Sequence, residues 1–125
     1  MAGVGNVVDW LTNHGYKGKY FRFSSMNYEL VEKVTKKHGA SKSAANVLFA
    51  TIMIWELVAA ATYLSAAALC VVGNETLVQY AFFIGMGLFA GLTLGNEAFI
   101  YYDDEEEHVT MFLAQLISYI AFAVL

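Results

Sequence analysis

The sequence predicts an all-α integral membrane protein: three transmembrane helices preceded by an interfacial segment and a short surface helix. Of the 125 residues, 58% are hydrophobic and only 14% are charged, whereas charged residues make up about 25% of a typical soluble domain. Three long apolar stretches follow residue 46, and the chain contains no proline. So few charges cannot cover a water-soluble surface, and so much apolar mass excludes a disordered chain. A soluble enzyme domain is excluded for the first of these reasons.

The charges divide the chain into two predicted domains. Seven basic and three acidic residues give residues 1–45 a net charge of +4, while eight acidic residues and no basic ones give residues 46–125 a net charge of −8. We therefore predict a basic, amphipathic head (1–45) and a three-span transmembrane domain (46–125). Lys and Arg are enriched on the cytoplasmic side of membrane proteins. This places the N-terminus on the cytoplasmic or matrix side of a bacterial or archaeal cytoplasmic membrane, or of the mitochondrial inner membrane.

The first 23 residues have the pattern of an interfacial anchor. Apolar residues recur at helical spacing at Val4, Val7, Val8 and Leu11. Beyond Gly15, aromatic residues alternate with the basic residues Lys17, Lys19 and Arg22. Aromatic side chains favour the depth of the lipid headgroups, and cations favour anionic phospholipid. We expect this basic head to face phospholipid or, alternatively, a partner subunit, and we expect no nucleic-acid partner.

A short surface helix is predicted from Tyr28 to His38. Its apolar residues fall on one face, and basic residues occupy its last turn before Gly39, which is a typical C-terminal pattern. Ser25 or Asn27 is expected to cap its start.

The three spans are predicted at residues 47–72, 77–102 and 109–125. About 20 apolar residues suffice to cross a bilayer, and 17 is the lower limit. The first two spans exceed 20 residues, each with one internal glutamate, and the third has 17 residues. Ser41 or Ser43 is expected to cap the first span, and the acidic run from Asp103 to Glu107 forms the predicted loop before the third.

Glu56 is the main intramembrane candidate for a functional role. A rise of ~1.5 Å per residue puts it about 5 Å from the midpoint of the first span, on the cytoplasmic side. A carboxylate at such a depth costs roughly 2.5–3.5 kcal/mol, so it should face protein or water and not lipid. Two interpretations remain open: a proton-relay or ligand-contacting carboxylate, or a glutamate that hydrogen-bonds a neighbouring helix and serves only to hold the structure.

A second polar group lies toward the cytoplasmic end of the second span. Glu97, beside Asn96, shares its half of the membrane with Glu56. These two glutamates are expected to line a polar pocket or a path for protons together with Tyr101, Tyr102 and His108. The alternative is that Glu97 extends to the membrane surface. All three histidines lie outside the predicted spans, so the sequence places no haem ligand within the membrane.

Gly87, Gly91 and Gly95 form a doubled G-x-x-x-G pattern in the second span. Small residues at this spacing allow another helix backbone to approach closely. The pattern predicts a helix-packing face, whose partner lies either within the chain or in another subunit.

Two resemblances bear on function. Residues 95–102 (GNEAFIYY), the segment Ile52–Glu56 and the segment Asn27–Val31 are similar to segments of the predicted small integral membrane proteins of the DUF2165 type, a family with no established activity. The arrangement of a polar N-terminal segment and three spans resembles the small membrane-anchor subunits of succinate dehydrogenase and fumarate reductase. That resemblance implies a quinone site and, often, a haem.

These observations favour a non-catalytic accessory or anchor subunit of a larger membrane complex, most plausibly an energy-transducing complex of a respiratory, electron-transport chain. A homo-oligomeric channel or small transporter using Glu56 and Glu97 is one alternative, and a quinone-binding anchor of an oxidoreductase is another. We expect no catalytic residue, no metal site and no cofactor of the chain's own, with bound lipid present. A quinone or haem would belong to a subunit interface. The single cysteine, Cys70, leaves no internal disulfide partner.

Overall fold

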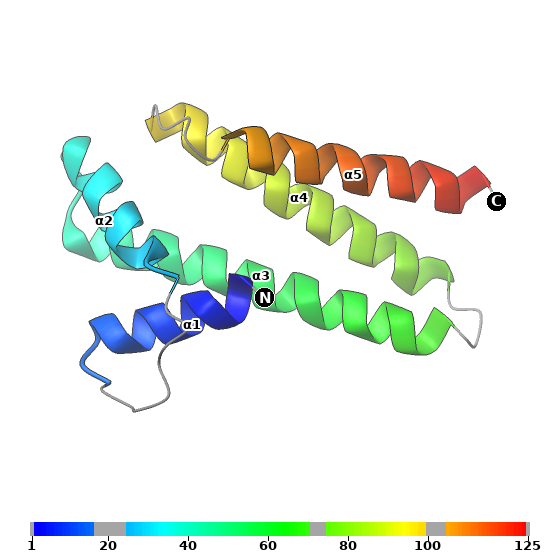
Figure 1. Cartoon of the computed structure of the whole chain (residues 1–125), viewed down its shortest axis with the longest axis horizontal. Helices are drawn as coiled ribbons and strands as arrows, with labels where there is room; N and C mark the ends of the chain where they lie inside the picture. Colours follow the sequence, from blue (N-terminus) through cyan, green and yellow to red (C-terminus); the bar gives the residue numbers. More distant parts are fainter. Residues whose placement is uncertain (1, 17–24, 71–74, 100–104, 125) are drawn as a thin grey trace. The chain divides into compact units, whose positions relative to one another are not determined.

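A computed structural model describes residues 2–16, 25–70, 75–99 and 105–124, which form five α-helices (Figure 1). The helices are α1 (Ala2–Asn13), α2 (Asn27–Lys37), α3 (Lys42–Cys70), α4 (Glu75–Phe99) and α5 (Glu105–Val124). Three of them are long and apolar enough to cross a membrane, over Lys42–Leu69, Glu75–Phe99 and Glu106–Val124. The predicted all-α class with three spans is confirmed.

The helices that span the membrane begin earlier than the apolar pattern alone predicts. In α3, the backbone N–H of Ala44 donates to Ser41 Oγ at 3.2 Å, so Ser41 is the predicted cap. This extends the helix five residues ahead of 47. In α5, the first turn contains Glu105, Glu106 and Glu107. Negative charge at a helix N-terminus is favourable because it faces the positive end of the helix dipole. Part of the predicted acidic loop is therefore helix.

The start of α2 is capped both by a neighbouring residue and from another helix. Asn27 is the first helical residue, and Met26 before it has a left-handed backbone (φ 60°) with no capping side chain. Instead, the backbone N–H of Tyr28 donates to Asp9 Oδ2 of α1 at 2.6 Å. The carboxylate thus satisfies one of the free N–H groups at the helix start. The backbone N–H of Asn27 donates to Ser25 Oγ at 3.4 Å, so the predicted contact with Ser25 is present beside this tertiary one.

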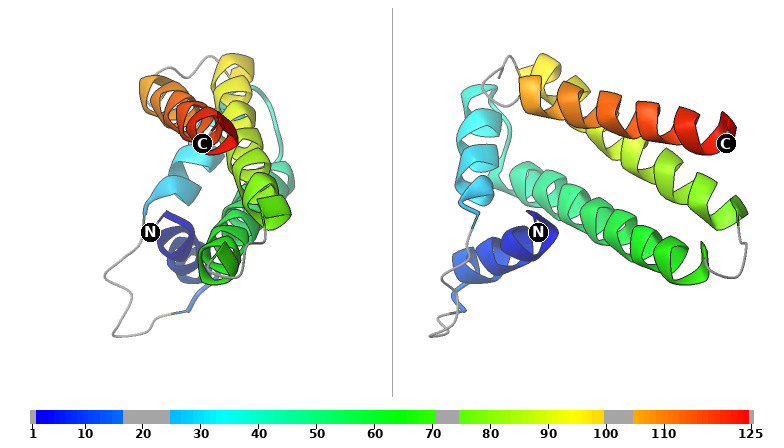
Figure 2. Two further views of the ribbon diagram at one scale, coloured as in Figure 1. Left: turned by 90° about the vertical axis from the view of Figure 1, so that its right-hand side faces the viewer. Right: turned by 45° about the vertical axis from the view of Figure 1, so that its right-hand side comes forward.

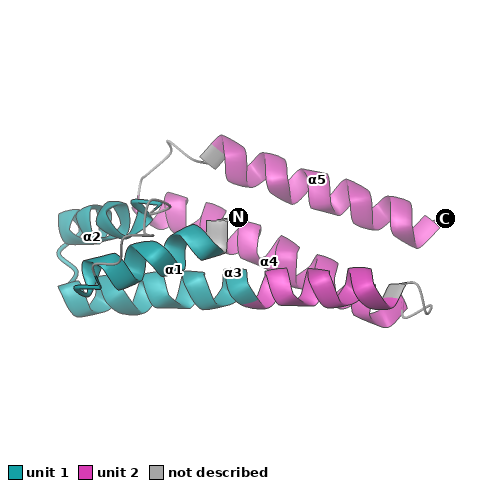
Figure 3. Cartoon of the chain, turned by 60° about the horizontal axis from the view of Figure 1, so that its bottom comes forward, with its two compact units in different colours: residues 1–57 teal, residues 58–125 magenta. Residues whose placement is uncertain are grey.

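The chain divides into two compact units, Met1–Leu57 and Val58–Leu125, with the boundary inside α3 (Figure 3). In the first unit α1 lies along the first half of α3, and α2 packs beside the start of α3 (Figure 1). The buried apolar residues of this unit are Tyr28, Ala45 and Phe49. The rings of Tyr28 and Phe49 meet edge to face, with centroids 5.4 Å apart.

In the second unit α4 and α5 run side by side in opposite directions (Figure 2). Phe82 of α4 is the centre of an aromatic cluster. Its ring centroid lies 6.0 Å from that of Tyr63 in α3, and 5.7 Å and 6.1 Å from those of Tyr119 and Phe122 in α5. Aromatic pairs at such distances contribute about 0.5–1.5 kcal/mol beyond their buried area. The cluster therefore joins all three apolar helices of this unit.

Candidate functional site

The first unit contains a cluster of hydrogen-bonded polar side chains, which we call the polar junction. It joins α1, the residues just before α2, and α3, and its members are Asn6, Asp9, Ser25, Asn27 and Glu56. Asn6 and Asp9 are each only 2% exposed. Polar groups so deeply buried are costly unless they are paired.

Asn6 is the centre of the polar junction. Its Nδ2 donates to Glu56 Oε2 at 2.6 Å. Its Oδ1 accepts from Ser25 Oγ at 2.7 Å and from Asn27 Nδ2 at 2.9 Å. One amide side chain therefore connects three segments, and both acceptor positions of its oxygen are occupied.

Asp9 forms the second half of the junction, one turn further along α1. Besides capping α2 through Tyr28, it accepts a hydrogen bond from Asn13 Nδ2 to Oδ1 at 3.2 Å. Tyr28 in turn donates its hydroxyl to Asn46 Oδ1 of α3. A continuous chain of hydrogen bonds thus runs from α1 through the start of α2 to α3.

This arrangement is suited to holding helices together. The donors of the junction meet acceptors, and the Oδ1 acceptor of Asn6 is saturated by protein groups. Among the described residues, no three His, Cys, Asp or Glu side chains lie close enough to hold a metal ion. The contact with Asn6 is the kind expected from the structural interpretation of Glu56, a hydrogen bond to a neighbouring helix.

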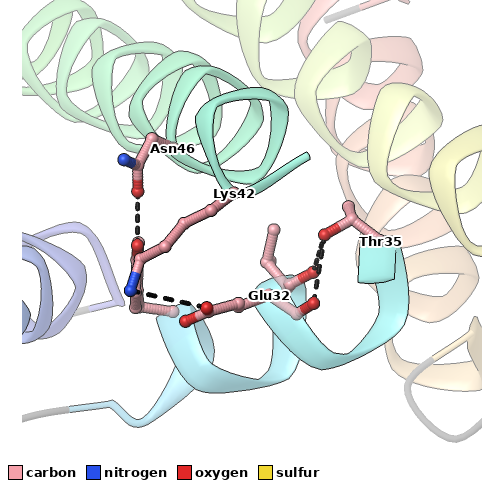
Figure 4. A network of polar contacts seen from close by, with 6 residues as sticks. Glu32, Thr35, Lys42 and Asn46 are labelled. Carbon is pink, nitrogen blue, oxygen red and sulfur yellow. Dashed lines mark hydrogen bonds and ion pairs between the residues drawn. The ribbon is translucent and has the colours of Figure 1, made fainter. Parts of the chain in front are cut away.

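The corner between α2 and α3 carries a weaker polar contact (Figure 4). Lys42 Nζ lies 3.5 Å from Glu32 Oε1, with the two side chains 69% and 35% exposed. Ion pairs so accessible to water contribute about 0–1 kcal/mol. The ion pair therefore contributes little to the packing of α2 on α3. That packing depends on the contacts of Tyr28 with Asn46 and Phe49.

Removing the Asp9 cap is a direct test of the junction's structural role. Asp9→Ala leaves the Tyr28 N–H without its acceptor, and losing a helix cap costs about 0.5–2 kcal/mol. We expect a lower thermal unfolding midpoint in detergent, followed by circular dichroism, and a smaller decrease for Asp9→Asn, which keeps an acceptor oxygen. Glu29→Ala, an exposed acid in the first turn of α2, is the matched control. Equal decreases for Asp9→Ala and Glu29→Ala would contradict the capping role.

The second predicted polar group is only partly assembled in the described residues. Asn96 Nδ2 of α4 lies 3.0 Å from His108 Nδ1 of α5. Glu97 is exposed, and Tyr101 lies outside the described residues, as do the basic head residues Lys17, Lys19 and Arg22. Asn96 and His108 therefore tie the end of α4 to the start of α5.

Side chains from two other helices approach α4 closely at a glycine that the sequence analysis did not single out. A Cβ placed on Gly85 would lie 2.6 Å from Tyr63 Oη, 2.9 Å from Tyr63 Cε2 and closer still to Gln115 Oε1. Gly85 is buried, as is Ala81 one turn before it. Ala81 and Gly85 have the same four-residue spacing as the glycines of the G-x-x-x-G pattern. A search of the sequence for small residues at this spacing, and not for glycines alone, would have predicted the contact.

The predicted glycine face lies elsewhere on α4. Gly91 is exposed, and open space surrounds the position that a Cβ on Gly95 would occupy. Gly87 is half-buried. The second unit therefore uses Ala81 and Gly85 for its own packing, while on the Gly87, Gly91 and Gly95 face Gly91 is exposed and the other two glycines are half-buried.

Two buried polar atoms beside Gly85, Tyr63 Oη and Gln115 Oε1, have no hydrogen-bond partner among the described residues. One is a donor and the other an acceptor. They converge on the same backbone position from α3 and α5, so the three apolar helices meet at Gly85.

Comparison with family models, curated proteins and solved structures finds no match to this chain.

Proposed function

We propose that this chain is a non-catalytic accessory or anchor subunit of a larger, energy-transducing membrane complex, in which its uncovered helix faces pack on the helices of other subunits. The observation that carries the proposal is the glycine face of α4, on which Gly91 is exposed and the Cβ position of Gly95 has open space around it. Glycines at four-residue spacing allow a close helix contact, and the second unit does not use Gly91 or Gly95 for one. A helix from another subunit is the partner that this face fits.

The burial of the apolar helices supports the same proposal. None of the described residues of α5 is buried, and α3 and α4 also expose large side chains, among them Leu64, Phe83 and Leu94. Side chains of this kind need either lipid or protein around them. The polar junction uses its donors and acceptors to hold helices, which suits an accessory subunit better than a transporter whose Glu56 must exchange protons.

The test is purification from source membranes in a mild detergent, with mass spectrometry and an absorption spectrum of the product. We expect large membrane-complex subunits in a fixed ratio to this chain. Gly91→Leu should lower their recovery at least severalfold, because the new side chain occupies the contact face. Ala114→Leu, which adds a leucine side chain at an exposed position of α5 and leaves the glycine face intact, is the matched control and should leave recovery unchanged.

Two results would overturn the proposal. Recovery of only further copies of this chain would favour the homo-oligomeric channel, and Glu56→Gln would then be tested in a transport assay. Unchanged recovery in Gly91→Leu would show that the glycine face is not the contact. If quinone or haem is detected in the product together with the large subunits, the chain would be identified more specifically as the membrane anchor of an oxidoreductase.

A further inference from the structure

The polarity of α1 is reversed relative to an amphipathic helix on a soluble protein. Such a helix normally turns its apolar stripe toward the core and its polar face toward water. In α1, the polar side chains of Asn6 and Asp9 are the buried ones. The stripe at positions i, i+3, i+4 and i+7 on the other side consists of Val4, Val7, Val8 and Leu11; Val4 is 63% exposed and the other three are half-buried.

The position of α2 indicates where the hydrocarbon region begins along α3. α2 covers the start of α3 through the contacts of Tyr28 with Asn46 and Phe49, and it exposes charged residues at Glu29, Lys33, Lys36 and Lys37. A charge within the hydrocarbon costs roughly 2.5–3.5 kcal/mol, so α2 and the part of α3 beside it lie outside. From Phe49 to Leu69 the helix extends about 30 Å, which is the thickness of the hydrocarbon region.

This boundary places α1 inside the hydrocarbon. Glu56 lies seven residues beyond Phe49, about 10 Å deep, and Asn6 is hydrogen-bonded to it. Just beyond the C-terminal end of α1, the ring centroid of His14 lies 6.0 Å from that of Tyr28, at the level of the boundary. α1 therefore runs inward from His14 toward its N-terminal end, and Val4 lies deeper than Asn6.

We propose that α1 is inserted into the hydrocarbon of one leaflet, with the Val4, Val7, Val8 and Leu11 stripe in contact with lipid acyl chains and its polar face on α3. Twelve residues give a length of about 18 Å, too short to cross the bilayer. Lipid is the occupant because the stripe lies at the same depth as exposed apolar side chains of α3, at Ile54, Trp55 and Leu57. The polar junction makes this insertion affordable, since the polar side chains of α1 are satisfied inside the unit.

This inference is independent of the proposed function and has its own test. A single cysteine at Val4, in a Cys70→Ser background, is labelled with the fluorophore NBD, and the full chain is reconstituted in phosphatidylcholine vesicles. We expect acyl chains brominated at carbons 9 and 10 to quench the emission at least twofold, and aqueous iodide to have little effect. Lys36→Cys in the exposed part of α2 is the matched control and should show the opposite pattern.

A label at Val8 gives a second position on the same stripe and is expected to behave like the label at Val4. Circular dichroism identical to that of the unlabelled chain shows that the labelled proteins keep their helices. Emission from Val4 and Val8 that brominated chains fail to quench would overturn the proposal. In that case, quenching by iodide would show that α1 lies in water, and protection from both quenchers would show that protein covers it.

Discussion

Replacing Asn6 by leucine is expected to release α1 from α3 and to lower the free energy of unfolding by about 3 kcal/mol. The leucine removes the amide that joins Glu56, Ser25 and Asn27, and each buried polar group left without a partner costs about 1–3 kcal/mol. Denaturation in detergent, followed by circular dichroism, measures the loss. Hydrogen exchange of the α1 amides, which should become faster, locates it.

A double-mutant cycle distinguishes the Asn6–Glu56 contact from a general loss of packing. Glu56→Leu should lower the free energy of unfolding less in the Asn6→Leu background than in the original chain. In the double variant both positions carry leucine, so no polar side chain of this pair faces an apolar one. Coupling between contacting residues is typically 0.5–3 kcal/mol. Additive costs would show that the two side chains do not depend on each other. Glu56→Gln, which keeps an acceptor oxygen for Asn6, should retain most of the stability.

Replacing Gly85 by valine should separate the three apolar helices that meet there. Even the first added carbon would lie 2.6 Å from Tyr63 Oη, well inside contact distance, and overpacking of this kind costs about 1–3 kcal/mol. We expect a lower unfolding midpoint. We also expect less cross-linking between cysteines introduced on the facing sides of α4 and α5, because both helices have to move.

Gly95→Val is the matched control for Gly85→Val. It makes the same change in the same helix, so any effect of valine on helix propensity is shared, but nothing lies within 4 Å of its Cβ position. The unfolding midpoint of the isolated chain should therefore change little. If both variants lost the same stability, the cause would be helix propensity and not the contact at Gly85.

The sequence predicted the class of the protein and its main helices well because these depend on local composition. Three apolar stretches require three spans wherever their neighbours lie. The helix ends were less exact, since α3 begins at the Ser41 cap and α5 includes glutamates that the hydropathy pattern assigned to a loop. In both cases a capping or dipole interaction extends the helix beyond its apolar part.

The candidate site was only partly predictable. Glu56 stood out because a carboxylate inside a span is costly and needs a partner. That its partner is Asn6, 50 residues earlier, could not be inferred, because the choice among several polar residues of the head depends on how the helices fold back on each other. Asp9 likewise carries no sequence pattern of a cap for α2, since it lies 19 residues before Tyr28.

The sequence by itself determined which segments prefer lipid and which prefer water. It contains apolar stretches long enough for a bilayer, a basic head and an acidic second part. What only the tertiary structure decided was which of several equivalent local patterns is used. Ala81 and Gly85 share their four-residue spacing with Gly87, Gly91 and Gly95, yet Gly85 receives side chains from two other helices, whereas open space surrounds the Cβ position of Gly95. The preference of a segment for lipid or for water is a sum over its own residues, so it can be calculated from the sequence of that segment alone. Helix contacts depend on distances between residues far apart in the chain, and these exist only once the helices have packed.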